Sequence, residues 1–108
     1  AGFSESYVKG KVKQMMEQIP SGSLCFWVSP SFSSSKYLAK RKAVETWLKD
    51  SLKAYTRVKC SLLTSIDEMS KQKACSSFNS SDGLHMTSCG SQLWGELISR
   101  KLCALGRL

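Results

Sequence analysis

Two short segments with strand patterns, on either side of a long helical segment, constrain this chain more than any other feature. Leu24 to Val28 is an unbroken apolar run with aromatic and β-branched residues, bounded by Ser and Pro, which is typical of a strand buried on both faces. Arg57 to Leu63 alternates apolar and polar residues, which is strand periodicity. The segment between them, after a Ser-rich loop and up to Tyr55, has helical spacing. Because strands joined by a helical crossover pair in parallel, the sequence predicts a βαβ unit.

Three further segments carry helical signals. Ser4 to Ile19 places its apolar residues three and four positions apart, on one face of a helix. Ser65 and Glu68 have the spacing of a capping box, which predicts a short helix from Ile66 to Ala74. The last segment, Gln92 to Leu105, has an apolar face wide enough for a packed core helix. With the long helix and a third strand predicted before the last helix, helices and strands alternate along the chain.

A third strand is predicted less clearly than the other two. Cys75 to Gly83 is a polar loop, and Leu84 to Cys89 alternates weakly between apolar and polar residues. The sequence therefore predicts the α/β class: a small single-domain sandwich with a short, mainly parallel sheet of about three strands, flanked by about four helices. If the third strand pairs antiparallel, the class becomes α+β. We expect residues 1–108 to form one compact domain, excised from a larger protein.

Composition narrows the surroundings in which we expect the chain to work. No apolar run approaches the roughly 20 residues of a membrane span, so we expect no membrane partner. The cysteines are odd in number and scattered, a pattern that favours a reducing compartment over a disulfide framework. They are Cys25, Cys60, Cys75, Cys89 and Cys103. We therefore expect an intracellular location, nuclear or cytoplasmic.

The charge of the chain is the feature that points most directly to a function. The net charge is +8, and the basic residues are concentrated before Cys60. Helical projection puts Lys42, Lys49 and Lys53 within about 40° of one another, opposite the apolar stripe. A ridge of ammonium groups on a rigid helix suits a phosphate backbone, so the sequence predicts a non-enzymatic module that binds RNA or DNA. The predicted contact residues are Lys40, Arg41, Lys42, Lys49 and Lys53.

Arg41 differs from these lysines because it projects onto the apolar face of the helix, between Tyr37 and Val44. A guanidinium there either runs along the surface to the helix end or points into a groove toward a carboxylate or phosphate. The sequence leaves both possibilities open.

Interaction with another protein is the second hypothesis. Met15, Met16, Trp94 and Leu105 exceed what one small core covers, and methionine-rich helix faces suit adaptable interfaces. The N-terminal or the C-terminal helix would then be the docking or dimer surface. No glycine-rich phosphate-binding motif occurs, so we expect no nucleotide cofactor.

A protease is the third hypothesis. Cys25 precedes the aromatic pair Phe26 and Trp27, and the sole histidine, His85, follows about 60 positions later. This order resembles that of papain-like viral leader proteases, which implies a Cys25 thiolate activated by the His85 imidazole. Cys75, His85 and Cys89 supply at most three metal ligands without a Cys-x-x-Cys pair, so we expect no metal and no other cofactor.

Overall fold

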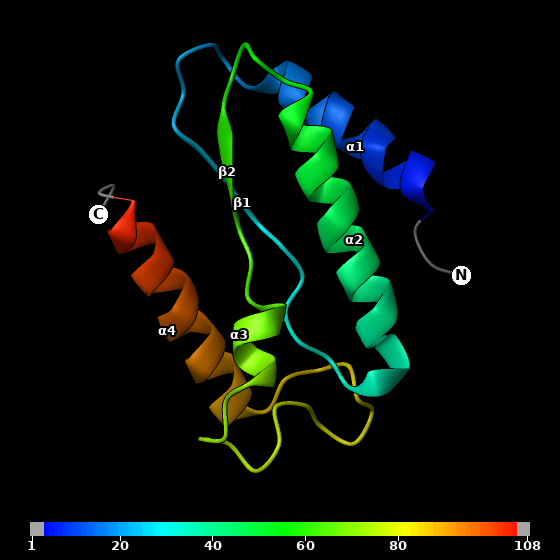
Figure 1. Ribbon diagram of the computed structural model, residues 1–108, viewed down its shortest axis with the longest axis vertical. Helices are drawn as coiled ribbons and strands as arrows, with labels where there is room; N and C mark the ends of the chain where they lie inside the picture. The colour runs from blue at the N-terminus through cyan, green and yellow to red at the C-terminus, as the bar shows by residue number, and fades with distance from the viewer. Residues whose placement is uncertain (1–3, 106–108) are drawn as a thin grey trace.

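A computed structural model describes residues 4–105 and confirms a small mixed α/β domain (Figure 1). The elements are α1 (Glu5–Gln18), β1 (Cys25–Val28), α2 (Ser35–Lys53), β2 (Cys60–Leu63), α3 (Ile66–Ser70) and α4 (Ser88–Ala104). The strands β1 and β2 pair in parallel, with Cys25 opposite Cys60 and Val28 opposite Leu63. The predicted βαβ unit is therefore confirmed, with α2 as its crossover.

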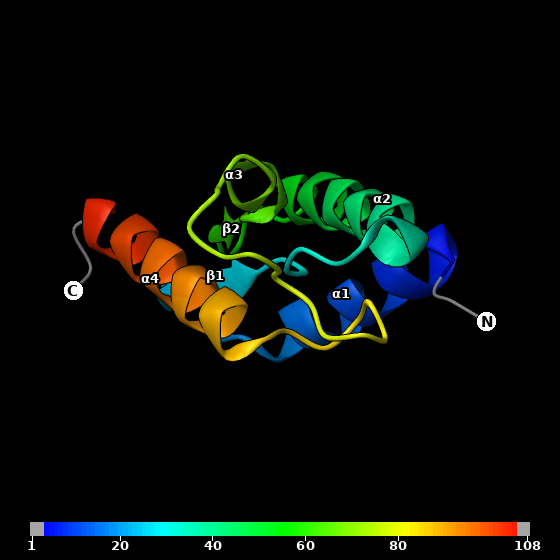
Figure 2. The ribbon, with the colours of Figure 1, turned by 90° about the horizontal axis from the view of Figure 1, so that it is seen from below.

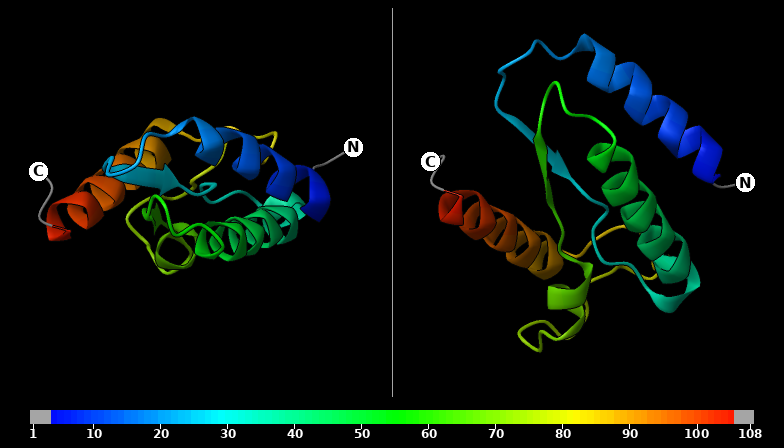
Figure 3. Two further views of the ribbon diagram at one scale, coloured as in Figure 1. Left: turned by 90° about the horizontal axis from the view of Figure 1, so that it is seen from above. Right: turned by 45° about the horizontal axis from the view of Figure 1, so that its top comes forward.

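The hydrophobic core lies where α1 and α2 pack beside each other against the strands (Figures 2 and 3). Ser4 caps α1 by accepting a hydrogen bond from the backbone N–H of Tyr7 at 3.1 Å. The apolar residues three and four apart then face inward, as their spacing predicts. The buried core residues are Val8, Val12, Met16, Leu48, Leu52 and Val58. Together they fix the position of α2, from which the basic side chains project.

The predicted third strand from Leu84 to Cys89 is wrong. Among the described residues, only an isolated antiparallel bridge between Asn79 and Met86 forms in this region. The helix α4 begins at Ser88 because the hydroxyl of Thr87 caps it, accepting from the N–H of Gly90 at 3.0 Å. The sheet in the described range therefore has two strands.

The helices do not cover the strand β1 completely. The helix α4 lies on the far side of the strands from α2 and contacts β2 rather than covering β1 (Figures 1 and 3). Val28 in β1 is therefore 46% exposed, and Leu24 just before the strand is 68% exposed. The expectation that this run is buried on both faces is wrong.

The predicted capping box at Ser65 is also wrong. The short helix α3 does begin at Ile66, but the Ser65 side chain makes no cap hydrogen bond. Its hydroxyl instead accepts from the indole N–H of Trp94 in α4 at 3.0 Å. Ser65 is fully buried, so a bond to a distant helix replaces the local one. This bond joins α4 to the rest of the domain.

Four of the five cysteines form disulfides. Cys25 bonds Cys60 across the paired strands, and Cys75 bonds Cys89 between the polar loop and α4. Cys103 is free and exposed. The expectation of reduced cysteines is therefore wrong, because pairing depends on spatial neighbours and not on an even count. The prediction of a reducing, intracellular compartment rested on unpaired cysteines. Because four of the cysteines are in disulfides, this argument for an intracellular location no longer holds.

Gly90 marks the place where the polar loop crosses the first turn of α4. A Cβ at this position would collide with the carbonyl oxygen of Phe78, which is backbone and cannot rotate away. We expect Gly90→Ala to lower the free energy of unfolding by about 1 to 3 kcal/mol through overpacking.

At Gly95, on the same helix, an added Cβ would have no neighbour within 4 Å. Gly95→Ala should therefore raise stability by about 0.5 to 1 kcal/mol in the same denaturant titration. Equal shifts for the two variants would contradict the close approach at Phe78.

Candidate functional site

Three lysines, two on α2 and one in the segment before β2, line one hollow beside α2. Lys49 and Lys53 project from α2, and Lys59 lies just before β2. All three are exposed, and Tyr55 and Leu62 are among the residues between them. None of the described residues that line the hollow is acidic. We call this surface the lysine hollow.

Lys42 lies on the same helix and is also exposed. It precedes Lys49 by seven residues, two helical turns, which corresponds to about 10 Å along the axis. Lys49 and Lys53 are one turn apart, about 6 Å. The predicted ridge of Lys42, Lys49 and Lys53 is therefore a surface feature of α2, with Lys59 added at one end.

Among the described residues, neither Glu45 nor Asp50, the two carboxylates of α2, forms an ion pair with a lysine of the ridge. Glu45 stands four residues before Lys49, yet its carboxylate accepts a hydrogen bond from Ser29 at 3.0 Å. In the part of the chain that the structure describes, no ion pair joins Glu45 to Lys49. Because these lysines are not neutralised locally, their positive charge remains available to a ligand.

The lysines of α1 do not extend the ridge in the same way. Lys9 pairs with Glu5 at 2.7 Å, and Lys13 lies 3.9 Å from Glu17. The hydrogen bond to Glu5 raises the pKa of Lys9. Lys9 and Lys13 are therefore matched by carboxylates on their own helix, and Lys11, the third lysine of α1, lies over the Tyr7 ring.

Lys40 and Arg41 lie apart from the lysine hollow, since neither is among the residues that line it. The Lys40 ammonium lies 5.7 Å from the centre of the Trp47 ring. Arg41 is half-buried and turns the other way, donating from Nη1 to the backbone oxygen and to the hydroxyl of Ser31, both at 2.9 Å. Arg41 therefore points into a groove, but its partner there is Ser31 and not the carboxylate or phosphate that the prediction named.

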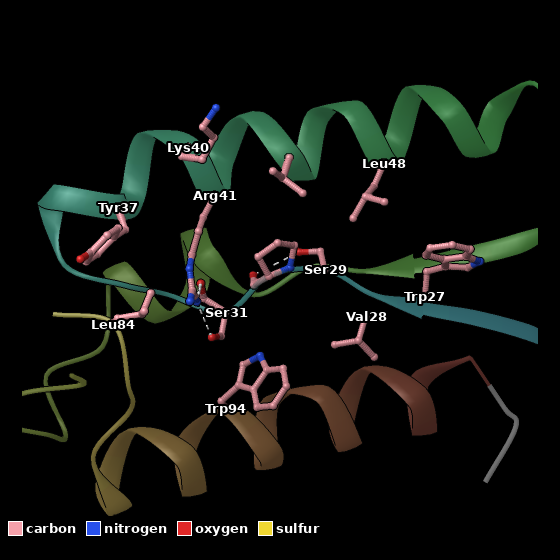
Figure 4. Close-up of a pocket in the computed structure, with 12 residues that line it drawn as sticks. Trp27, Val28, Ser29, Ser31, Tyr37, Lys40, Arg41, Leu48, Leu84 and Trp94 are labelled. Carbon is pink, nitrogen blue, oxygen red and sulfur yellow. Dashed lines mark hydrogen bonds between the residues drawn. The ribbon is translucent and has the colours of Figure 1, made fainter. Parts of the chain in front are cut away.

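That groove is a cleft of about 940 Å³ between α2 and α4, with β1 at its base. Figure 4 shows Arg41 running from α2 to Ser31 inside the cleft, while Lys40 points away from it. Trp94 reaches into the cleft from α4. We call this the Arg41 cleft. The cleft could not be predicted from the sequence, because its walls come from segments that are far apart along the chain.

The arrangement that the protease hypothesis requires is absent from the described residues. Cys25 is bonded to Cys60 and therefore has no thiol to ionise. His85 lies in an exposed loop, where its Nδ1 is 2.5 Å from Asp82. The hydrogen bond with His85 holds the pKa of Asp82 well below its usual range. Cys25 and His85 are thus explained by a disulfide and a loop contact, and the catalytic assignment is wrong.

Two apolar residues of the protein-interaction hypothesis are exposed. Met15 is 55% exposed and Leu105 is 43% exposed, whereas Met16 is buried in the core and Trp94 is half-buried. The exposed pair lies at separate places, on α1 and at the end of α4. Each of the two helices named as a possible docking surface therefore exposes one of these residues, Met15 on α1 and Leu105 at the end of α4, and docking through either helix stays a prediction.

Neither a metal site nor a membrane span is present between residues 4 and 105. That range contains no group of three or more His, Cys, Asp or Glu able to hold a metal ion. Within it, no helix has both the length and the apolar character needed to span a bilayer.

No protein-family model matches the chain, and no curated protein or solved structure shows significant similarity to it. The function is therefore inferred from the surfaces of this chain itself, here the lysine hollow and the Arg41 cleft.

Proposed function

We propose that this chain binds the phosphate backbone of RNA or DNA through the lysine hollow. The observation that supports the proposal is the convergence of Lys49, Lys53 and Lys59 on one surface whose described lining is free of carboxylates. Lysine ammonium groups bind phosphate as point charges and gain free energy by releasing counterions from the nucleic acid. Lys42 extends the contact along α2, whereas Lys40 lies over the Trp47 ring and does not belong to this surface.

The chemistry of the hollow favours recognition of the backbone over recognition of bases. Tyr55 is the single aromatic residue among the described residues that line the hollow, so they offer no platform on which successive bases stack. Nor does this lining include a row of Asn, Gln or Arg side chains to read base edges. We therefore expect binding that depends strongly on salt and weakly on sequence.

The test is a titration of short labelled single- and double-stranded oligonucleotides at about 50 mM and about 200 mM salt. The variant Lys49→Gln, Lys53→Gln, Lys59→Gln should lose on the order of a hundredfold in affinity at the lower salt concentration, because three phosphate contacts disappear. Its plot of log affinity against log salt should also become shallower by about 2 to 3.

A matched control removes the same charge from elsewhere. Lys71, Lys73 and Arg100 are exposed and line no part of the hollow. Their simultaneous replacement by Gln should change affinity and salt slope much less. If the two triple variants lose equal affinity, net charge rather than the hollow determines binding. If the unaltered protein binds no oligonucleotide at the lower salt, the proposal is wrong.

A further inference from the structure

The Arg41 cleft has the composition of a small-molecule site. Its volume of about 940 Å³ is at the upper end of typical ligand pockets. Most of its lining is apolar or aromatic, and no acidic residue is among the described residues that line it. The apolar and aromatic lining residues include Trp27, Val28, Tyr37, Val44, Leu48 and Trp94. Such a surface binds an apolar body and leaves orientation to a few polar groups.

Part of this apolar lining is not covered by the protein itself. Val28 is 46% exposed and Leu84, at the edge of the cleft, is 36% exposed. The wall formed by α4 is held to the domain through Trp94 and Lys101, which donate to Ser65 and to the carbonyl of Thr64. The cleft therefore stays open between α2 and α4 (Figure 4).

Arg41 supplies the polar group that would orient a ligand. Both of its hydrogen bonds to Ser31 come from Nη1. Its Nε–H and Nη2–H donors have no partner among the described residues, and together they form the edge of a guanidinium that pairs side-on with a carboxylate. The bonds to Ser31 hold the guanidinium in the cleft, so the geometry is fixed before a ligand arrives.

We propose that the Arg41 cleft binds a small amphipathic carboxylate, with the carboxylate on Arg41 and the apolar body against Trp27, Val28 and Trp94. A single guanidinium balances one negative charge. A phosphate dianion would favour a second cation, but the other basic residue of the lining, Lys40, points away (Figure 4). This site is separate from the lysine hollow, so it does not depend on the proposed nucleic-acid binding.

The test compares decanoate with 1-decanol, which shares its chain length but has no charge. Binding to the full chain is followed by tryptophan fluorescence and by NMR shifts of the Val28 and Trp94 signals. We expect decanoate to bind more tightly than decanol. Arg41→Gln should weaken decanoate binding about 10- to 100-fold and leave decanol binding unchanged, because only the charge-assisted hydrogen bonds are lost. Arg41→Lys should recover part of the loss, since it keeps the charge but not the side-on pair.

Two controls separate the site from general effects. Arg100→Gln removes the same charge from an exposed position on α4 outside the cleft and should leave decanoate affinity unchanged. Val28→Trp fills the cleft and should abolish binding of both probes, while the melting temperature confirms folding. Equal affinity for the two probes, or no effect of Arg41→Gln, would overturn the proposal. A dimer in sedimentation that protects Val28 and Trp94 would also overturn it, because a second copy would then occupy the cleft.

Discussion

Replacing both Cys25 and Cys60 with alanine is expected to lower the free energy of unfolding by about 3 to 4 kcal/mol. The disulfide closes a loop across 35 positions, which contains all of α2, and it joins residues directly opposite each other in the parallel pair. Without it, the unfolded chain regains the freedom that the loop removes. The sheet would then rest on the hydrogen bonds of only two four-residue strands.

Denaturant unfolding of the wild type and the variant, at equal pH, measures this difference. The Cys75–Cys89 disulfide serves as the comparison, because it spans only 14 positions and its removal should cost less, about 3 kcal/mol. Titration of thiols in the denatured, unreduced protein should detect one thiol, that of Cys103. Five reactive thiols, or a wild-type unfolding curve that a reductant does not shift, would show that the bonds do not form.

The part of the fold that could be predicted is the part set by local periodicity. The apolar spacing of α1 and α2 and the runs that become β1 and β2 each reflect contacts within a few residues or one turn. The predicted third strand does not form, because the apolar and polar alternation from Leu84 to Cys89 is weak and Thr87 provides a helix cap. The Thr87 hydroxyl accepts a hydrogen bond from the N–H of Gly90, so α4 begins at Ser88. The weak strand-like alternation of this segment hid the start of the helix.

The tertiary partners of several residues could not be predicted. Ser65 has the spacing of a capping box, but its buried hydroxyl bonds Trp94, 29 positions away. The Cys25–Cys60 pair follows from strand register, which one sequence does not reveal. The odd cysteine count pointed away from disulfides, although a single free thiol explains it.

In the candidate sites too, features set by local periodicity could be predicted and features set by tertiary contacts could not. The ridge of Lys42, Lys49 and Lys53 could be predicted, because projection on one helix requires only the period of 3.6 residues. Lys59 was missed as a member of the site, since the register of β2 beside α2 brings it there. Its sequence signal was its position as an outward residue in the alternating run before Cys60. The inward direction of Arg41 was visible in projection, but its partner Ser31 was not.

Trp94→Ala is expected to lower the free energy of unfolding by about 2 to 3 kcal/mol, somewhat less than for a fully buried tryptophan, and to loosen α4. Gly90 is the one residue of α4 that the structure describes as buried, so this helix depends on specific contacts, among them the Cys75–Cys89 disulfide and the bond from Lys101 to Thr64. The Trp94 indole supplies one of them by donating to the buried hydroxyl of Ser65. Without it, that hydroxyl loses its partner and the cleft loses part of a wall.

Trp94→Phe separates the two contributions, because phenylalanine keeps most of the apolar area but has no N–H donor. Its expected cost is about 1 to 2 kcal/mol, the effect of leaving the Ser65 hydroxyl unpaired. Hydrogen exchange should then show faster exchange in α4 for the alanine variant, while α1 and α2 keep their protection, since their shared core does not include Trp94. Equal costs for the two variants would mean that the hydrogen bond accounts for the whole contribution of Trp94 to stability. Uniformly faster exchange across all the helices would instead show that α4 unfolds only with the whole domain.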